Sequence, residues 1–143
     1  MSWFKAAVRF PIRVVQVAPT EYLFPDKALQ ELNLHATGEI STSNDLHHTI
    51  SDRTEVIYTD CWPHSENIER IRTLFLPYQI TGKILSRMSN HGFFLPCPPV
   101  TRGQEVSDES MASEKCKNYA AKEYLLHSQN AIMEFLIQEK DIE

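Results

Sequence analysis

The sequence predicts an α/β domain with a mostly parallel sheet. Short apolar or β-branched runs alternate with segments of helical pattern along the chain, which is the order that parallel βα units produce. The 143 residues suffice for one domain with its own hydrophobic core. A content of 42% hydrophobic and 23% charged residues is also ordinary for a globular protein.

Four short runs are typical of strands. The first, IRVVQVA at 12–18, is apolar and β-branched, which predicts a strand buried on both faces. The other three are shorter: GEIST at 38–42, EVIYT at 55–59 and GFFL at 92–95.

Helical patterns fill the segments between these runs. We expect helices at 2–8, 25–32, 44–51, 65–75, 81–88, 107–111 and 120–137. The predicted N-caps are Asn44, Ser65 and Ser107, because short polar side chains accept a hydrogen bond from a free helical N–H.

Apolar spacing predicts which helix faces are buried. The expected buried positions are Ala28, Leu29 and Leu32 in the second helix, and Ile68, Ile71 and Phe75 in the helix at 65–75. The last helix carries one stripe of Ala121, Leu125, Ala131, Ile132 and Phe135, with Leu126, Met133 and Ile137 beside it.

Composition excludes several classes of partner. A net charge of −5 argues against a nucleic-acid binder, which would show a basic face. No apolar run approaches membrane-spanning length, and the N-terminal residues lack the pattern of a signal peptide. Three cysteines in a chain of this kind are expected to be reduced, which favours the cytoplasm. No glycine pattern typical of a nucleotide site occurs, and we expect no cofactor.

Two chemical clusters follow predicted strands. The segment DCWP at 60–63 follows one strand, and PCPP at 96–99 follows another. Because ligands of open parallel sheets bind at the carboxyl ends of the strands, both clusters are expected at one sheet edge. Asp60 beside Trp62 suits a cationic amine, by charge and by cation–π contact.

The prolines around Cys97 predict backbone carbonyls at this edge that can accept hydrogen bonds from a ligand. Prolines lack a backbone donor and fix φ, which leaves nearby carbonyls free to accept a hydrogen bond from a ligand. The bond between Pro98 and Pro99 is also a candidate cis peptide.

Simpler interpretations of the same residues remain open. Cys97 can be a small buried hydrophobe, and Asp60 can cap the next helix. Arg102 can serve only to pair with Glu105 or Asp108. Cys61 and His64 have the spacing of a metal-ligand pair, but no second pair lies nearby.

Four segments in order resemble one protein family. YTDCWP, LPYQIT, FFLPCPPVTRGQEVSDESM and LLHSQNAIMEFLI are together similar to the second, amino-acid-binding domain of the ornithine carbamoyltransferase family, within the aspartate/ornithine carbamoyltransferase group. The resemblance covers nearly the whole chain, residues 1–143. It implies a Rossmann-like, three-layer domain and carbamoyl transfer from carbamoyl phosphate to the amine of ornithine.

The resemblance assigns roles to particular residues. Asp60 matches the aspartate that binds the side-chain amine of ornithine. Cys97 matches the cysteine of a His-Cys-Leu-Pro segment that lies against ornithine and the carbamoyl group, and Pro99 matches its proline. Pro98 replaces the leucine of that segment, and Arg102 is a minor candidate.

The chain departs from the family pattern at several positions. Pro96 replaces the histidine before the cysteine, and Leu125 aligns with an arginine that reaches carbamoyl phosphate. WPHSEN replaces a Ser-Met-Gly turn that contacts the amino acid backbone of the substrate, and Cys61 stands near the substrate arginine of the aspartate enzymes. The amine end of the substrate is therefore better matched than the carboxylate end, so putrescine or a modified ornithine is an alternative to ornithine.

The family's first domain has no counterpart in this sequence. Its Ser-Thr-Arg-Thr phosphate loop is missing, so carbamoyl phosphate would have to be held by a domain outside this chain. The family also has a strand before the helix matched by SWFKAAV, so we expect the chain to lack the first central strand of the sheet. The resemblance further implies a homo-oligomer, which is a trimer in the family.

Two functions follow from these observations. The first is the amine-binding part of a carbamoyltransferase, inactive by itself. The second is a non-catalytic domain of the same fold that binds a small molecule or a partner protein.

Overall fold

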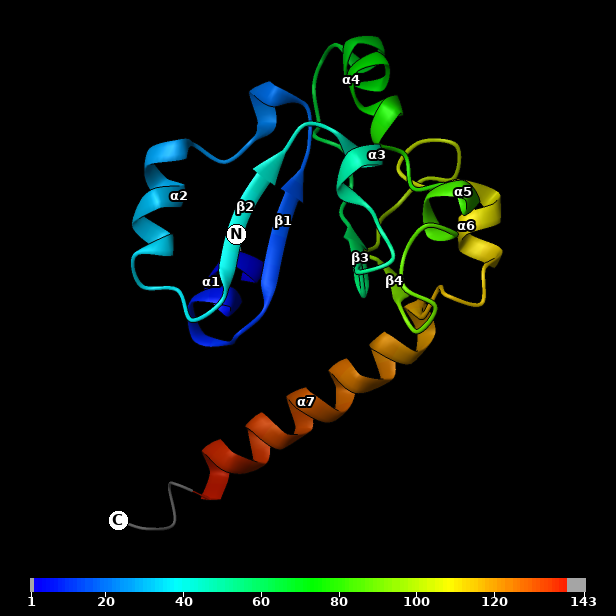
Figure 1. Cartoon of the computed structure of the whole chain (residues 1–143). Coiled ribbons are helices and arrows are strands. Elements are labelled where there is room, and N and C mark those ends of the chain that lie inside the picture. Colours follow the sequence, from blue (N-terminus) through cyan, green and yellow to red (C-terminus); the bar gives the residue numbers. More distant parts are fainter. Residues whose placement is uncertain (1, 139–143) are drawn as a thin grey trace.

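The computed structural model describes residues 2–138. Met1 and residues 139–143, which the expected domain also includes, lie outside the described residues. Helices and strands alternate along the chain, as predicted (Figure 1). The elements are α1 Ser2–Arg9, β1 Arg13–Val17, η1 Thr20–Tyr22, α2 Asp26–Asn33, β2 Glu39–Ser43, α3 Leu46–Thr49, β3 Val56–Thr59, α4 Ile68–Phe75, η2 Leu76–Tyr78, α5 Gly82–Leu85, β4 Phe93–Pro96, α6 Asp108–Ala112 and α7 Asn118–Gln138.

The strands form two small parallel sheets. Strand β1 pairs with β2, with Val14 opposite Ile40, and β3 pairs with β4, with Ile57 opposite Phe94. The α/β class with parallel strands is therefore confirmed. Among the described strands, the β1–β2 sheet and the β3–β4 sheet are not hydrogen-bonded to one another.

The division of the sheet explains one wrong prediction. Strand β1 was expected to be buried on both faces, but Arg13 is exposed and the other four residues are only half-buried. Among the described strands β1 pairs with β2 alone, so one of its long edges has no neighbouring strand. The apolar residues of IRVVQVA are typical of a strand covered on both faces, but in this structure both faces of β1 are only partly covered.

Two hydrophobic clusters hold the fold together. The larger lies around β3, β4 and α5 and buries Leu46, Ile50, Ile57, Ile80, Ile84, Leu85, Met88, Phe94 and Val106. The smaller joins α1 to β2 through Phe4, Ala7 and Ile40, and Leu29 and Leu32 of α2 pack partly buried against it. The larger cluster also receives Val17 from the end of β1, so it contacts both sheets, and it supports the strand ends that carry the predicted site.

Two of the predicted helix starts are wrong by one or more residues. Asp45, not Asn44, caps α3, since its side chain accepts a hydrogen bond from the His48 N–H at 2.8 Å. Asn67, not Ser65, caps α4 by accepting from the Arg70 N–H at 3.0 Å. In each case a second short polar residue stood close by, and local sequence does not choose between two such candidates.

The later start of α4 also changes one expected core residue. Ile68 is the first residue of the helix and is 69% exposed, whereas Ile71 and Phe75 are buried as predicted. Ser107 caps α6 as predicted, within a capping box completed by Ser110.

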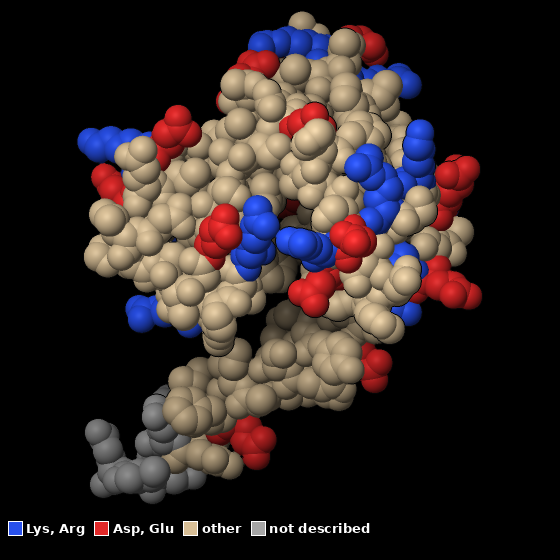
Figure 2. Space-filling view, viewed as in Figure 1, with Lys and Arg blue, Asp and Glu red and all other residues tan. Residues whose placement is uncertain are grey.

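Helix α7 differs from the other helices in its surroundings. It extends away from the two sheets (Figure 1), and no residue of its span Asn118–Gln138 is buried. In the view of Figure 2 its surface is mostly uncharged, whereas acidic and basic side chains are interspersed over the rest of that face. No described helix is long and apolar enough to cross a membrane.

Candidate functional site

The ends of β3 and β4 bring the two predicted clusters together. Thr59 pairs with Pro96 at the last position of the β3–β4 ladder, and the Cys97 N–H donates to the Thr59 carbonyl at 2.8 Å. Asp60 and Cys97 therefore leave neighbouring strand ends side by side. We call residues 60–67 the β3 loop and residues 97–106 the β4 loop.

Asp60 presents an exposed carboxylate at this edge. Its Oδ1 accepts a hydrogen bond from the Cys61 N–H at 2.9 Å, which fixes the side chain against its own loop. Asn67 caps the helix that follows, so the interpretation of Asp60 as a helix cap is wrong. Desolvation, followed by the negative charge of Asp60, raises the pKa of the Cys61 thiol.

Tyr58 is a neighbour of Cys97 that the sequence did not single out. A hydrogen bond with the Cys97 thiol, followed by burial, raises the pKa of Tyr58 well above its usual range. Negative charge on Asp60 acts in the same direction. Tyr58 lies on β3, two residues before Asp60, which directly follows the strand; if the extended course continues to Asp60, this spacing places both on one face and could have identified Tyr58.

The prolines of the β4 loop lie beyond Cys97. The peptide bond between Pro98 and Pro99 is cis, as the sequence suggested, and both prolines are exposed. Arg102 forms an exposed ion pair with Asp108 at 2.9 Å, which is one of the simpler interpretations given above. Arg102 is therefore occupied at the start of α6, and exposed pairs of this kind contribute little to stability.

Trp62 faces another part of the molecule. Its ring is half-buried 6.0 Å from the ring of Phe75, which also packs against Tyr22 at 4.8 Å. These contacts place the indole in an aromatic cluster between α4 and η1. The structure thus gives Trp62 a packing role in addition to the amine contact that the sequence predicted.

Glu105 is a second residue that the sequence did not identify as part of the site. Its side chain is 4% exposed, and its two carboxylate oxygens accept from the backbone N–H groups of Trp62 and Thr101, each at 2.8 Å. One carboxylate thus connects the β3 loop to the β4 loop. The sequence interpretation considered Glu105 only as an ion-pair partner of Arg102, which pairs with Asp108 instead.

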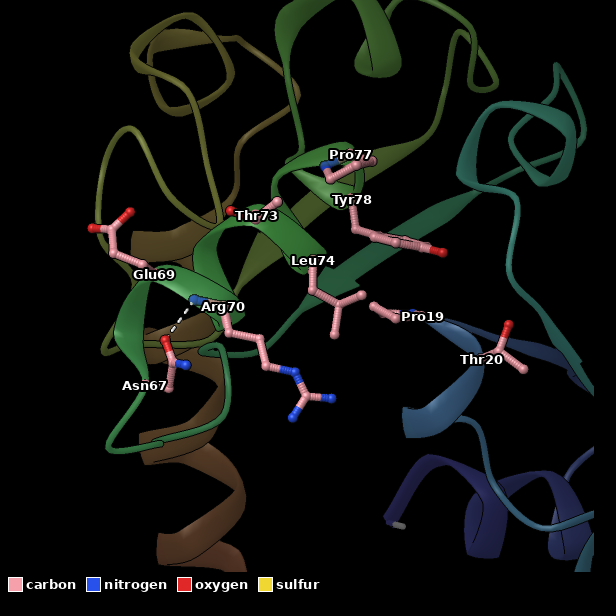
Figure 3. A pocket seen from close by; sticks show the side chains of 9 residues that line it. All are labelled: Pro19, Thr20, Asn67, Glu69, Arg70, Thr73, Leu74, Pro77 and Tyr78. Carbon is pink, nitrogen blue, oxygen red and sulfur yellow. Dashed lines mark hydrogen bonds between the residues drawn. The ribbon is translucent and has the colours of Figure 1, made fainter.

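A surface hollow of about 730 Å³ is lined by a different set of residues (Figure 3). The loop after β1 lines one side through Pro19 and Thr20, and α4 and η2 line the other through Arg70, Leu74 and Tyr78, among others. None of the nine residues that line it is a predicted site residue. Arg70 of this hollow is paired with Glu21 at 2.7 Å, so its charge is already compensated.

The described residues do not meet the requirements of a metal site. Within residues 2–138 no group of three or more His, Cys, Asp or Glu side chains is placed to hold a metal ion. Cys61 and His64 are both exposed in the β3 loop.

Comparison with known proteins identifies the family. The sequence model of the family described as aspartate/ornithine carbamoyltransferase, Asp/Orn binding domain, matches residues 1–136. The chain belongs to this family. The resemblance stated from the four segments is thereby confirmed.

Individual relatives agree with the family assignment. The chain is 33% identical over 141 residues to an ornithine carbamoyltransferase of Nitratidesulfovibrio vulgaris, covering 96% of this chain and 46% of that protein. It is 31% identical over 143 residues to the ornithine carbamoyltransferase of Psychrobacter arcticus, covering 97% and 45%. The chain therefore spans less than half the length of these relatives.

A solved structure shows the same fold. The ornithine carbamoyltransferase from Pyrococcus furiosus superimposes with a TM-score of 0.81 at 25% identity, covering 92% of this chain and 44% of that one. An N-acetyl-L-ornithine transcarbamylase superimposes with a TM-score of 0.76 at 23% identity, which supports the fold alone. The chain thus shares the fold of somewhat less than half of each of these solved chains.

Proposed function

We propose that this chain is the amine-binding part of a carbamoyltransferase. The observation that carries the proposal is the juxtaposition of Asp60 and Cys97 at neighbouring strand ends, in a chain that matches the family over residues 1–136. The transferase activity and ornithine named for the relatives support the same function.

The proposed reaction is attack of a neutral amine on the carbamoyl carbon of carbamoyl phosphate. A bond forms between the amine nitrogen and that carbon, the bond from carbon to the phosphate oxygen breaks, the amine loses a proton and phosphate leaves. The product from ornithine would be citrulline. Most of what this chain can contribute is orientation of the amine, because holding two reactants in line removes much of the entropic barrier.

Each proposed site residue has a part in that orientation. The Asp60 carboxylate would receive the amine before it loses its proton, and Cys97 with Pro98 and Pro99 would face the carbamoyl group. Trp62 and Arg102 would shape the rim of the site from their loops. We propose that carbamoyl phosphate is held by another domain, because this chain matches less than half the length of its ornithine carbamoyltransferase relatives.

The amine is proposed as ornithine or a related molecule. The match at Asp60 concerns the side-chain amine, while WPHSEN stands where the family contacts the amino acid backbone of the substrate. Putrescine or a modified ornithine therefore remains in the proposal. The three free cysteines favour the cytoplasm as the site of action, and the family resemblance favours a homo-oligomer.

The test measures amine binding directly. Calorimetry with ornithine and with putrescine on the 143-residue chain should show binding, and Asp60→Asn should weaken it by about 1–3 kcal/mol, the scale of a charge-assisted hydrogen bond. Asp52→Asn is the matched control, since Asp52 is an exposed acid in the turn before β3. Equal affinities of the wild type and Asp60→Asn would refute the role of Asp60.

A non-catalytic binding domain is the alternative function. Pro96 and Leu125 favour it, because both stand where the family pattern has a polar residue, and Leu125 is 57% exposed on α7. The two functions differ in turnover. The chain alone should form no citrulline or carbamoylputrescine from carbamoyl phosphate under either function, but only the first predicts turnover once a carbamoyl-phosphate-binding domain of the family is supplied.

A further inference from the structure

Glu105 is a charged side chain in the interior of the molecule. It is 4% exposed, and its neighbour Val106 is fully buried in the larger hydrophobic cluster. Removing a carboxylate from water is costly unless hydrogen bonds compensate the charge. A buried glutamate therefore needs donors, and which donors it has indicates what it holds.

The donors come from two loops. Glu105 Oε1 accepts from the Trp62 N–H at 2.8 Å, and Oε2 accepts from the Thr101 N–H at 2.8 Å. Trp62 lies two residues after Asp60 in the β3 loop, and Thr101 lies two residues after Pro99 in the β4 loop. One side chain thus bridges the two segments that carry the proposed site.

The backbone of Glu105 is anchored independently of its side chain. Its carbonyl accepts from the Ile80 N–H at 2.9 Å, and Val106 beside it forms an isolated bridge with Ile80. The carboxylate is therefore held from the core side while its oxygens hold the loops. A change of the Glu105 side chain can therefore release the Trp62 and Thr101 amides while the Ile80 amide keeps its hydrogen bond to the Glu105 carbonyl. General unfolding would release all three amides.

We propose that Glu105 is a positioning residue that holds the β3 loop against the β4 loop just beyond the strand ends that carry Asp60 and Cys97, and thereby fixes the course of both loops around the amine site. It does not touch the amine. The inference deepens the proposed function and rests on it, because the consequence of the positioning is amine affinity. A charged acceptor suits this task, since hydrogen bonds to an ionised carboxylate are stronger than those between neutral groups.

The sharpest variant is Glu105→Gln. Glutamine has nearly the same volume, but one carboxylate oxygen becomes an NH₂ group, which would face a backbone N–H donor in place of an acceptor. One of the two loop contacts must then break. Glu105→Asp keeps the charge and both acceptors on a shorter stem, and Glu114→Gln makes the same chemical change at an exposed position.

Two measurements on the full chain test the inference. Hydrogen exchange by NMR reports the Trp62, Thr101 and Ile80 amides, and calorimetry with ornithine and putrescine reports affinity. In Glu105→Gln we expect faster exchange at Trp62 or Thr101, unchanged exchange at Ile80, and amine binding weaker by about tenfold, the size of one charge-assisted hydrogen bond. Glu105→Asp should recover part of the affinity, and Glu114→Gln should match the wild type.

Several results would overturn the inference. Unchanged amine affinity in Glu105→Gln would do so. Loss of amide protection at Ile80 as well as at Trp62 and Thr101 would also do so, because a residue needed only for folding gives that pattern. If the Ile80 amide loses its protection in Glu105→Gln, the Glu105→Asp variant decides. It must show faster exchange at Trp62 or Thr101 with unchanged exchange at Ile80, and any other result overturns the inference.

Failure of the proposed function gives a different pattern. A wild-type chain that binds neither amine would refute the proposed function alone. The exchange pattern would then still decide whether Glu105 holds the loops, since it needs no ligand. Unchanged exchange at both Trp62 and Thr101 in Glu105→Gln would overturn the positioning role as well.

Discussion

The region around β3 and β4 and the helix α7 are both rich in apolar residues, but only the first buries them. Phe94 on β4 is fully buried in the larger hydrophobic cluster, whereas Phe135 on α7 is 59% exposed. Leu125, Ile132 and Ile137 on the helix are each more than half exposed as well. Apolar spacing therefore predicts that a helix forms and which residues it would bury, but not whether a partner surface is present.

The boundary between the two regions is sharp. The Lys117 N–H donates to the Phe94 carbonyl at 2.9 Å, and the Lys115 ammonium donates to the Ser89 carbonyl at 2.6 Å. These contacts hold the chain to β4 and to the segment before it up to Lys117, and α7 starts one residue later at Asn118. The helix is thus anchored at its N-terminal end and depends on its own hydrogen bonds beyond it.

The largest expected effect is in hydrogen exchange. Amides of β3 and β4 should exchange only through global unfolding, while amides in the second half of α7 should exchange through local opening, because isolated helices are marginal in water. We expect protection factors in β4 to exceed those around Phe135 by about a thousandfold or more. Exchange monitored by NMR on the labelled chain measures the difference.

Amides of α7 that are as strongly protected from exchange as those of β4 would contradict the difference between the two regions. Such protection would mean that something covers the helix in solution, such as another copy of the chain. Repeating the exchange at several protein concentrations distinguishes the two states, since self-association depends on concentration and local helix stability does not.

The second effect is on global stability. Phe94→Ala should lower the free energy of unfolding by about 3–5 kcal/mol, because it removes a large buried ring and leaves a cavity between β4 and α5. Phe135→Ala is the matched control and should change stability by no more than about 0.5 kcal/mol. Urea unfolding followed by circular dichroism measures both, and similar losses in the two variants would show that α7 is packed after all.

The order of elements was predictable because apolar periodicity is a local property. All four strands and the long helix occur close to the expected ranges. The surroundings were not predictable from residues alone: IRVVQVA indicated a strand covered on both faces, yet β1 is half-buried beside one neighbour. Helix starts failed for a smaller reason, since Asn44 and Asp45 are both able to cap and only the backbone geometry selects Asp45.

The sequence predicted the residues of the candidate site that lie at strand ends, but not the neighbouring residues that hold them in place. Asp60 and Cys97 follow apolar runs, and parallel pairing of those runs brings them together. Glu105 lies 43 residues from the Trp62 amide that it accepts from, so no local pattern shows the contact. Tyr58 was missed because a tyrosine in a strand is ordinary, and its proximity to Cys97 depends on the β3–β4 register.

A smaller effect concerns hydroxyl groups in the two regions. Ser107 accepts from the Ser110 N–H at 3.1 Å and caps α6, whereas Ser128 on α7 donates to the Tyr124 carbonyl at 2.8 Å on an exposed face. Ser107→Ala should cost about 1 kcal/mol, because it leaves a helical N–H without its cap. Ser128→Ala should stay within about 0.5 kcal/mol, since the Tyr124 carbonyl already accepts within the helix. Equal effects in urea unfolding would contradict the distinction.

The smallest expected effect is in the titration of one tyrosine. Tyr58 on β3 has Cys97 as a polar partner, while Tyr119 on α7 is 86% exposed. The hydrogen bond with Cys97, then burial, raises the pKa of Tyr58, so the neutral phenol persists in the folded protein to a higher pH than in the unfolded chain. The stability linked to this shift is fully present below the unfolded pKa of about 10 and is lost as pH rises above it.

Cys97→Ala removes the thiol whose interaction with Tyr58 contributes most to the raised Tyr58 pKa. The pKa of Tyr58 should therefore fall, and tyrosinate absorbance near 295 nm should rise at a lower pH than in the wild type. Cys61→Ala is the control, because the pKa of Tyr58 is raised by Cys97, burial and Asp60, and the exposed Cys61 thiol does not contribute. Tyr58→Phe identifies the signal by removing it. If Cys97→Ala and the wild type titrate alike, the contact between Tyr58 and Cys97 does not persist in solution, and the proposed site loses the neighbour that fixes its thiol.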